Sequence, residues 1–232
     1  MMKRIFLLCT MSSLVFSCVE NDKAKVVDGW TILFDGSSYN QWRGFQNMKV
    51  PEEWIIEDDA MVYVPGNQGG KTIITKNRYT NFTLSLEWKI SKGGNSGIFW
   101  GVDNDEKYSV AYQTGPEIQI RDNEIRPGTL VLKVHRAGAI FDVLAPSEDV
   151  ANPIGEWNRC IIDIDHNVNE GIVILNGKEI LKFPVHGNIW KQLVDKSKFK
   201  DWEGFGNYKT GYIGLQDHGN SVWYRNIKIK IK

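Results

Sequence analysis

The chain has 232 residues, with 28 basic and 28 acidic side chains and a formal net charge of zero. No basic stripe runs along the sequence, which argues against a nucleic-acid partner. Only Cys160 among the three cysteines lies after residue 18, so the mature domain cannot form an internal disulfide and must be stabilised by core burial. The 9 Trp, 8 Tyr and 10 Phe are many for this length. We expect most of them in the core and a few at a binding surface.

The N-terminal segment is typical of an exported protein. Lys3 and Arg4 precede an apolar run over residues 5–16, which is too short to span a membrane and closes on Ser17 and Cys18. We predict a signal peptide over residues 1–17, lipidation of Cys18 as in the bacterial lipobox, and a polar tether over residues 18–28. An ordinary signal peptide with an incidental cysteine is the plainer alternative. Residues 29–232 then form a single domain.

Period-two alternation broken by glycine and asparagine turns predicts an all-β fold. In residues 82–90, for example, apolar side chains occupy every second position. The predicted strands, in chain order, span 30–34, 54–57, 61–64, 72–75, 82–90, 96–100, 117–121, 139–143, 157–165, 170–175, 178–183, 211–216 and 222–232, with a short helix within 189–200. So many short strands favour a sandwich of two curved antiparallel sheets.

Two strands carry polar residues where the pattern predicts a groove. Glu117, Gln119 and Arg121 alternate with isoleucines, so their side chains share one sheet face at intervals of about 7 Å. The second strand ends in Gln216, Asp217 and His218 before a glycine turn. A single histidine at a strand end is commonly an ordinary surface residue, but the amide and carboxylate beside it make a functional role about equally plausible. Asn95, in another glycine-rich strand, is a further candidate.

Metal binding stays open at this stage. The four histidines, at 135, 166, 186 and 218, lack the paired spacing of a zinc site. The acidic run over residues 103–106 reads as a solvated loop, with a calcium site as the alternative. A divalent ion bound by Glu117 and His218 is a further alternative. Cys160 alternates with core isoleucines and has no neighbour that would activate it, so we expect a buried packing residue.

The sequence resembles the 3-keto-disaccharide hydrolase family from about residue 29 to the C-terminus. The segments that carry the resemblance occur in the family's order, at 30–36 (WTILFDG), 95–98 (NSGI), 117–120 (EIQI), 138–142 (GAIFD), 155–158 (GEWN), 175–177 (LNG), 215–219 (LQDHG) and 223–227 (WYRNI). The resemblance implies a concanavalin A-like jelly roll that acts on glycosides whose carbon-3 hydroxyl is oxidised to a ketone. It also implies an exported, membrane-anchored lipoprotein on the periplasmic or cell-surface face of a bacterial outer membrane.

A ketone at carbon 3 acidifies the hydrogen on carbon 2, so one base and one acid suffice to eliminate the aglycone from carbon 1. We predict that Glu117 and His218 are this pair and that Gln119 and Arg121 hold the ketone and hydroxyls. Asn95, Gln216 and Asp217 would orient the sugar, and addition of water would complete net hydrolysis. One alternative is a non-catalytic carbohydrate-binding lipoprotein, and another is a glycosidase that pairs Glu117 with Asp122 or Glu87. A purely structural lipoprotein ranks last.

Overall fold

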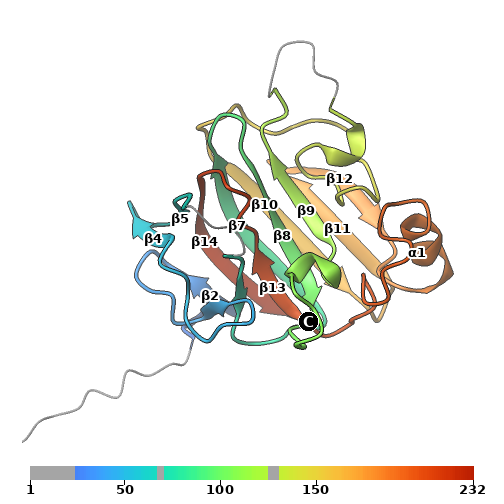
Figure 1. The fold of residues 1–232 in the computed structure, drawn as a ribbon, viewed down its shortest axis with the longest axis horizontal. Coiled ribbons are helices and arrows are strands. Elements are labelled where there is room, and N and C mark those ends of the chain that lie inside the picture. Colours follow the sequence, from blue (N-terminus) through green and yellow to red (C-terminus); the bar gives the residue numbers. More distant parts are fainter. Residues whose placement is uncertain (1–23, 67–70, 125–130) are drawn as a thin grey trace, which may run out of the picture.

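The computed structural model describes residues 24–66, 71–124 and 131–232 (Figure 1). The predicted signal peptide, the lipidation site at Cys18 and the first part of the predicted tether lie outside the described residues. The last part of that tether contains the two-residue strand β1 (Val26–Val27). No helix in the described ranges is both long and apolar enough to cross a membrane.

The described chain folds into two antiparallel sheets. The larger sheet consists of β1, β2 (Trp30–Phe34), β4 (Trp54–Glu57), β5 (Ala60–Tyr63), β7 (Phe82–Ile90), β10 (Asn158–Asp165), β11 (Glu170–Leu175), β12 (Lys178–Phe183) and β14 (Val222–Ile231). Its main path runs β1-β2-β14-β7-β10-β11-β12, and β5, which pairs with β4, joins the sheet along β14.

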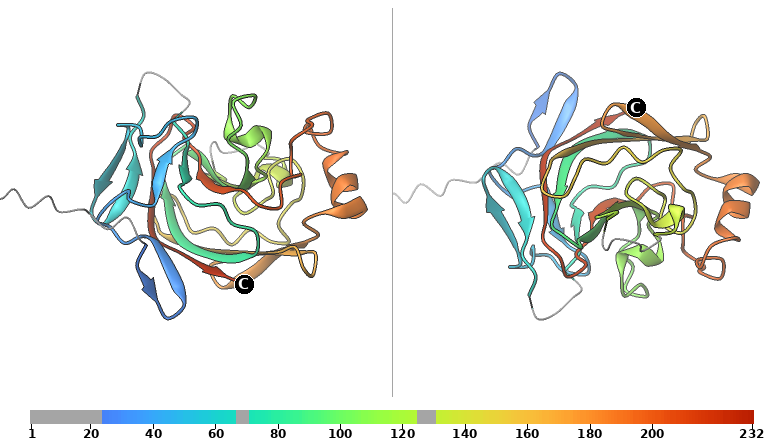
Figure 2. Two further views of the ribbon diagram at one scale, coloured as in Figure 1. Left: turned by 90° about the horizontal axis from the view of Figure 1, so that it is seen from below. Right: turned by 90° about the horizontal axis from the view of Figure 1, so that it is seen from above.

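The smaller sheet has five strands, β3 (Trp42–Gly44), β6 (Ile73–Thr75), β8 (Asn95–Val102), β9 (Glu117–Arg121) and β13 (Tyr212–Leu215). They lie in the order β3-β6-β13-β8-β9. Figure 2 shows the larger sheet curving around one face of the smaller sheet, while the loops that carry the 3₁₀ helices η1 (Ala111–Gln113) and η2 (Lys133–His135) lie on its other face. The predicted jelly-roll sandwich is therefore confirmed.

The main core fills the space between the two sheets. The apolar positions of β7 are buried as the alternation predicts, from Phe82 to Ile90, and Ile118 and Ile120 of β9 meet them from the smaller sheet. Cys160 is a buried member of this core, and burial raises the pKa of its thiol to about 12. A second, smaller apolar cluster, which includes Phe99 and Ala111, lies on the opposite face of the smaller sheet. This outer face carries the polar residues considered below.

Local turn chemistry matches the predicted hairpin. Asn176 and Gly177 have φ angles of 50° and 85° between β11 and β12, as a two-residue type I′ turn requires. The predicted short helix is present but begins two residues earlier than expected: α1 spans Gly187–Val194, and the chain continues in turns to residue 200.

The strand predicted over residues 139–143 is wrong. This segment starts beside β9, where the Phe141 N–H donates to the Glu117 carbonyl, but it then turns because Val143 and Leu144 donate back to Ile140. Asp142 adopts a left-handed φ of 60° in that turn. Strand β3, with three residues, was not predicted.

Candidate active site

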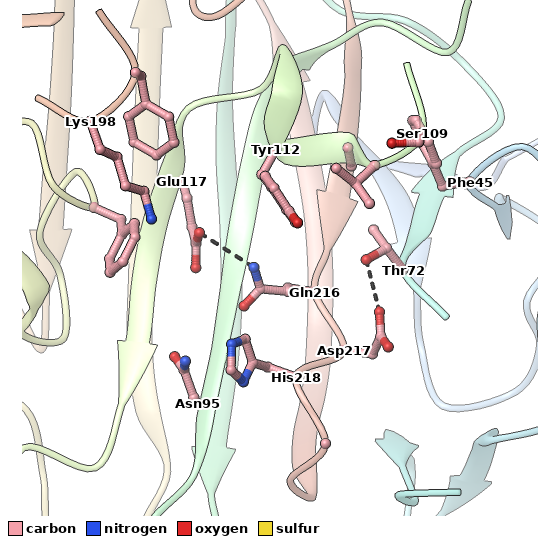
Figure 3. A pocket seen from close by; sticks show the side chains of 15 residues that line it. Phe45, Thr72, Asn95, Ser109, Tyr112, Glu117, Lys198, Gln216, Asp217 and His218 are labelled. Carbon is pink, nitrogen blue, oxygen red and sulfur yellow. Dashed lines mark hydrogen bonds between the residues drawn. The ribbon is translucent and has the colours of Figure 1, made fainter. Parts of the chain in front are cut away.

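The outer face of the smaller sheet holds a cavity of about 510 Å³, which lies within the usual size range of small-molecule sites. Its lining combines aromatic, amide, carboxylate, imidazole and ammonium groups, contributed by Phe45, Thr72, Asn95, Ser109, Val110, Ala111, Tyr112, Glu117, Phe141, Lys198, Phe199, Gln216, Asp217, His218 and Gly219. Figure 3 shows these side chains above strands of the smaller sheet. Five of the seven residues predicted for the site therefore share one cavity, and Gln119 and Arg121 do not line it.

The strand order explains why distant residues meet here. Glu117 begins β9, Asn95 begins β8, and Gln216 follows β13, which pairs with the other edge of β8. The main chain fixes this arrangement, because the Gln216 N–H donates to the Gly97 carbonyl at 2.9 Å. The Ser96 hydroxyl also donates to the Gln216 carbonyl at 2.7 Å.

Glu117 is the only carboxylic acid of the lining that is buried, with 7% of its surface exposed. Its Oε2 accepts a long hydrogen bond of 3.4 Å from the Gln216 amide. Burial raises the pKa of Glu117 to about 8, although the nearby Lys198 ammonium and the Gln216 amide both act to lower it. A carboxyl group whose pKa lies near neutrality can exchange a proton with a bound substrate.

Gly97 leaves the space that this carboxyl group occupies. A Cβ atom placed on Gly97 would lie 2.2 Å from Glu117 Oε1 and 2.6 Å from Glu117 Cδ. Gly97 pairs with Gln119, two residues along β9, so the Glu117 side chain leans across the neighbouring strand over the bare glycine. Because Gly97 has no side chain, the Glu117 carboxyl group can occupy this position.

Asp217 and His218 directly follow Gln216 and also line the cavity. His218 is exposed, and in Figure 3 the Gln216 side chain lies between its ring and Glu117. Asp217 is partly buried, and its Oδ1 accepts a 2.9 Å hydrogen bond from the Thr72 hydroxyl. The two predicted catalytic side chains consequently face the same cavity, as a shared proton-transfer role requires.

Gln119 and Arg121 are placed differently from the prediction that both contact the ligand. Gln119 is 2% exposed and its amide donates to Asn95 Oδ1 at 3.0 Å, so it orients a residue of the lining. Arg121, at the end of β9, is partly buried, and its Nε has no hydrogen-bond partner among the described residues.

Several residues of the lining escaped the sequence analysis. Lys198 and Phe199 come from the turns after α1, Phe141 from the misassigned strand, and Tyr112 from η1. Tyr112, Lys198 and Phe199 belong to no motif of the sequence, because long-range packing alone brings their loops over the sheet. Phe141 lies within the 138–142 segment that carries the family resemblance, and this was the signal that could have found it.

The carboxylates proposed as alternative partners of Glu117 are engaged elsewhere. Asp122 is buried and accepts hydrogen bonds from the Gly93 and Glu124 main-chain N–H groups, at 2.8 and 2.9 Å. Glu87 lies on the larger sheet and pairs with Arg225 at 2.7 Å. Neither lines the cavity. Within the described ranges, no group of three or more His, Cys, Asp or Glu side chains is arranged to hold a metal ion.

Comparisons with known proteins agree with this architecture. A curated relative from Bacteroides thetaiotaomicron, named 3-keto-disaccharide hydrolase, is 33% identical over 88% of this chain and 79% of its own length. A solved protein of Parabacteroides distasonis, described as a candidate glycosyl hydrolase, is 29% identical, with a TM-score of 0.81 over 88% of this chain and 94% of its own. A second protein from that organism, described in the same way, is 28% identical with a TM-score of 0.67, and the match covers 88% of this chain and 99% of the other.

The family model for the 3-keto-alpha-glucoside-1,2-lyase-like domain matches residues 29–230. This range includes every strand from β2 onward, apart from the last residue of β14, and every residue of the cavity lining. The chain therefore belongs to the family of 3-keto-alpha-glucoside-1,2-lyase-like domains.

Proposed function

We propose that this glycoside hydrolase-like enzyme cleaves the glycosidic bond of 3-keto-glycosides by proton abstraction next to the ketone, elimination and hydration. The observation that carries the proposal is the single buried carboxyl group of the cavity lining, that of Glu117, which faces an open cavity together with His218. Hydrolysis of an unmodified glycoside uses two carboxyl groups across the scissile bond. Asp217, the other carboxylate of the lining, is bonded to Thr72, so the site fits a reaction that needs one carboxylate and one imidazole.

In this mechanism Glu117 acts as the base in its ionised form. Its carboxylate takes the proton from carbon 2, and the electrons of that C–H bond form an enolate with the carbon-3 ketone. The enolate expels the aglycone from carbon 1, leaving a double bond between carbons 1 and 2, and the departing oxygen takes a proton from His218. Water then adds its hydroxyl to carbon 1 and a proton to carbon 2, which completes net hydrolysis.

The remaining polar groups of the lining would bind the sugar. Gln119 fixes the Asn95 amide by donating to its Oδ1, which leaves the Asn95 NH₂ group to donate to a sugar oxygen. Gln216 Oε1 is buried and has no hydrogen-bond partner among the described residues, so it offers an acceptor for a sugar hydroxyl. Asp217 offers a further carboxylate acceptor, and the rings of Tyr112 and Phe45 supply apolar surface for the sugar faces.

The test compares a glycoside with its 3-keto derivative on purified protein, with and without chelator, and follows the products by NMR. We expect turnover of the 3-keto compound alone. Replacing Glu117 by Gln or His218 by Ala should each lower kcat at least about 100-fold, whereas Glu156→Gln, at an exposed loop position, should not. Tight binding of an intact 3-keto-glycoside would instead identify a non-catalytic carbohydrate-binding lipoprotein, and near-normal rates in both site variants would refute the assignment.

We also propose that Cys18 anchors the exported protein to a bacterial membrane through attached lipid, on the periplasmic or cell-surface face. The support is the apolar run followed by Ser17 and Cys18, and two or more acyl chains make such attachment stable. In a bacterial host, Cys18→Ser should move the protein from the membrane fraction to the soluble exported fraction. A soluble wild-type protein without added lipid mass would contradict the anchor.

A further inference from the structure

Lys198 places an ammonium group in the candidate active site. Its side chain lines the cavity beside Glu117, and Figure 3 shows the Lys198 ammonium and the Glu117 carboxyl group facing the same part of it. The Nζ atom lies 4.2 Å from the centre of the Phe141 ring and 5.0 Å from that of Phe199. Among the described residues, no carboxylate lies within 4.0 Å of this ammonium to form an ion pair.

The main chain of Lys198 is fastened to the strand that carries Glu117. Its N–H donates to Asp142 Oδ2 at 2.7 Å, and Asp142 Oδ1 bonds to His135 Nε2 at 2.8 Å. The preceding Phe141 stacks on the His135 ring, with centroids 4.6 Å apart, and donates its own N–H to the Glu117 carbonyl at 2.9 Å. Asp142 thus connects the turn at Lys198, through the adjacent Phe141, to the main chain of Glu117.

We propose that Lys198 is a catalytic residue that stabilises the enolate oxygen at carbon 3, and that Asp142 is the positioning residue that holds it there. This inference rests on the proposed function. As Glu117 takes the carbon-2 proton, the electron pair of the carbonyl moves onto the carbon-3 oxygen, and that oxygen accepts a hydrogen bond from the Lys198 ammonium. A donor fixed where negative charge develops is among the strongest contributions an active site makes.

The surroundings of Lys198 suit this role better than a purely structural one. A lysine that stabilises a fold through its charge normally has a carboxylate partner, whereas this ammonium rests on two aromatic rings and points into a cavity. Phenylalanine faces attract the cation without neutralising it, so its charge stays available to a ligand. The same charge acts on Glu117 and favours the ionised form that the reaction requires.

The first test compares Lys198→Gln with Lys196→Gln, an exposed lysine two residues away. We expect Lys198→Gln to lower kcat by about 100-fold with little change in KM, because the enolate charge exists only after proton transfer. The acidic limb of the pH–kcat/KM profile should also move to higher pH, since Lys198 acts to lower the pKa of Glu117. Lys196→Gln should match the wild type. A rise in KM alone, or an unmoved pH limb with normal kcat, would overturn the proposal.

A second test isolates enolate formation. A 3-keto sugar analogue without a leaving group at carbon 1 can exchange its carbon-2 hydrogen in D₂O but cannot eliminate, and NMR follows the exchange above the uncatalysed rate. Lys198→Gln should slow the exchange, Asp142→Asn should slow it less, and His218→Ala should leave it intact. If Lys198→Gln and Asp142→Asn both exchange the carbon-2 hydrogen at the wild-type rate, this inference is refuted and the proposed function stands. If the unmodified enzyme neither exchanges that hydrogen nor cleaves the 3-keto-glycoside, the proposed function is refuted as well.

Discussion

A methyl group added at Gly97 tests whether the position of the Glu117 carboxyl group controls activity. The Cβ atom of Gly97→Ala would lie 2.2 Å from Glu117 Oε1, which is about 1 Å closer than the 3.4 Å at which ordinary contact begins. Gly97 has no positive φ, so alanine introduces no backbone strain at this position. The three atoms nearest to the added methyl group all belong to Glu117, and this side chain has to move.

The expected effects on activity and stability are of different size. A displacement of about 1 Å in a reacting group can cost roughly 100-fold in rate, so we expect kcat to fall by about that factor. Overpacking a buried site typically costs about 1–3 kcal/mol. For a domain of this size each 1 kcal/mol lowers Tm by roughly 2–4 °C. The variant should therefore remain folded at 25 °C, with unchanged far-UV circular dichroism and a lower Tm in calorimetry.

A double-mutant cycle separates this clash from a general disturbance of the strand. In the background of Glu117→Ala the opposing carboxyl group is gone, so the added methyl group at residue 97 should no longer lower Tm, which corresponds to a coupling energy of about 1–3 kcal/mol. An equal loss of stability in both backgrounds would place the damage elsewhere in β8. Full activity in Gly97→Ala would refute the link between this glycine and the carboxyl group.

Three further predictions concern charge and hydrogen bonding around the site. The folded state holds the Glu117 proton up to about pH 8, while the unfolded chain releases it near 4.5, so its contribution to stability is complete below pH 4.5 and is lost as the pH rises through 8. Glu117→Gln should remove that loss, raising the urea-derived free energy of unfolding at pH 9 relative to the wild type. Gln119→Leu should raise KM about 5- to 10-fold with a smaller change in kcat, because Asn95 loses its orienting hydrogen bond. Asp122→Ala should lower Tm by several degrees while kcat stays normal, since this carboxylate supports a loop and lies outside the cavity; a large loss of kcat would revive the carboxylate-pair mechanism.

The sequence carried the architecture because alternation is a local signal. In β7, alternate residues face the core and the opposite side of the sheet, so the sequence pattern alone shows which residues are buried. The positive φ angles that Asn176 and Gly177 adopt specify the hairpin between β11 and β12 in the same local way. The same reasoning fails at residues 139–143, a short and mainly apolar segment that resembles a buried strand. There the decisive feature is a turn around Ile140 and a left-handed Asp142, which hydropathy does not encode.

The candidate site was predictable only in part, for a related reason. The alternation of side chains along the strand predicts that Glu117 and Ile118 lie on opposite faces of the sheet, and the structure places them so. This alternation does not reveal the order of the strands in the sheet. Residue 117 lies near residues 216–218 because β8 lies between β9 and β13. Lys198 is harder still, because it lies in a turn far along the chain that only tertiary contacts, such as the bond of its N–H to Asp142, bring to the cavity.

The energetics around Glu117 favour a functional explanation over a structural one. A carboxyl group buried with a single long hydrogen bond destabilises the fold whenever it is ionised, and a glycine inside a strand weakens that strand. A glutamine at residue 117 would avoid the first cost, but it could not take a proton. Two unfavourable choices on neighbouring strands, Glu117 and Gly97, serve the same carboxyl group. Residues that lower local stability are concentrated at functional sites. A buried Glu117 and a bare Gly97 at one point of the cavity are therefore what a proton-transferring carboxyl group requires.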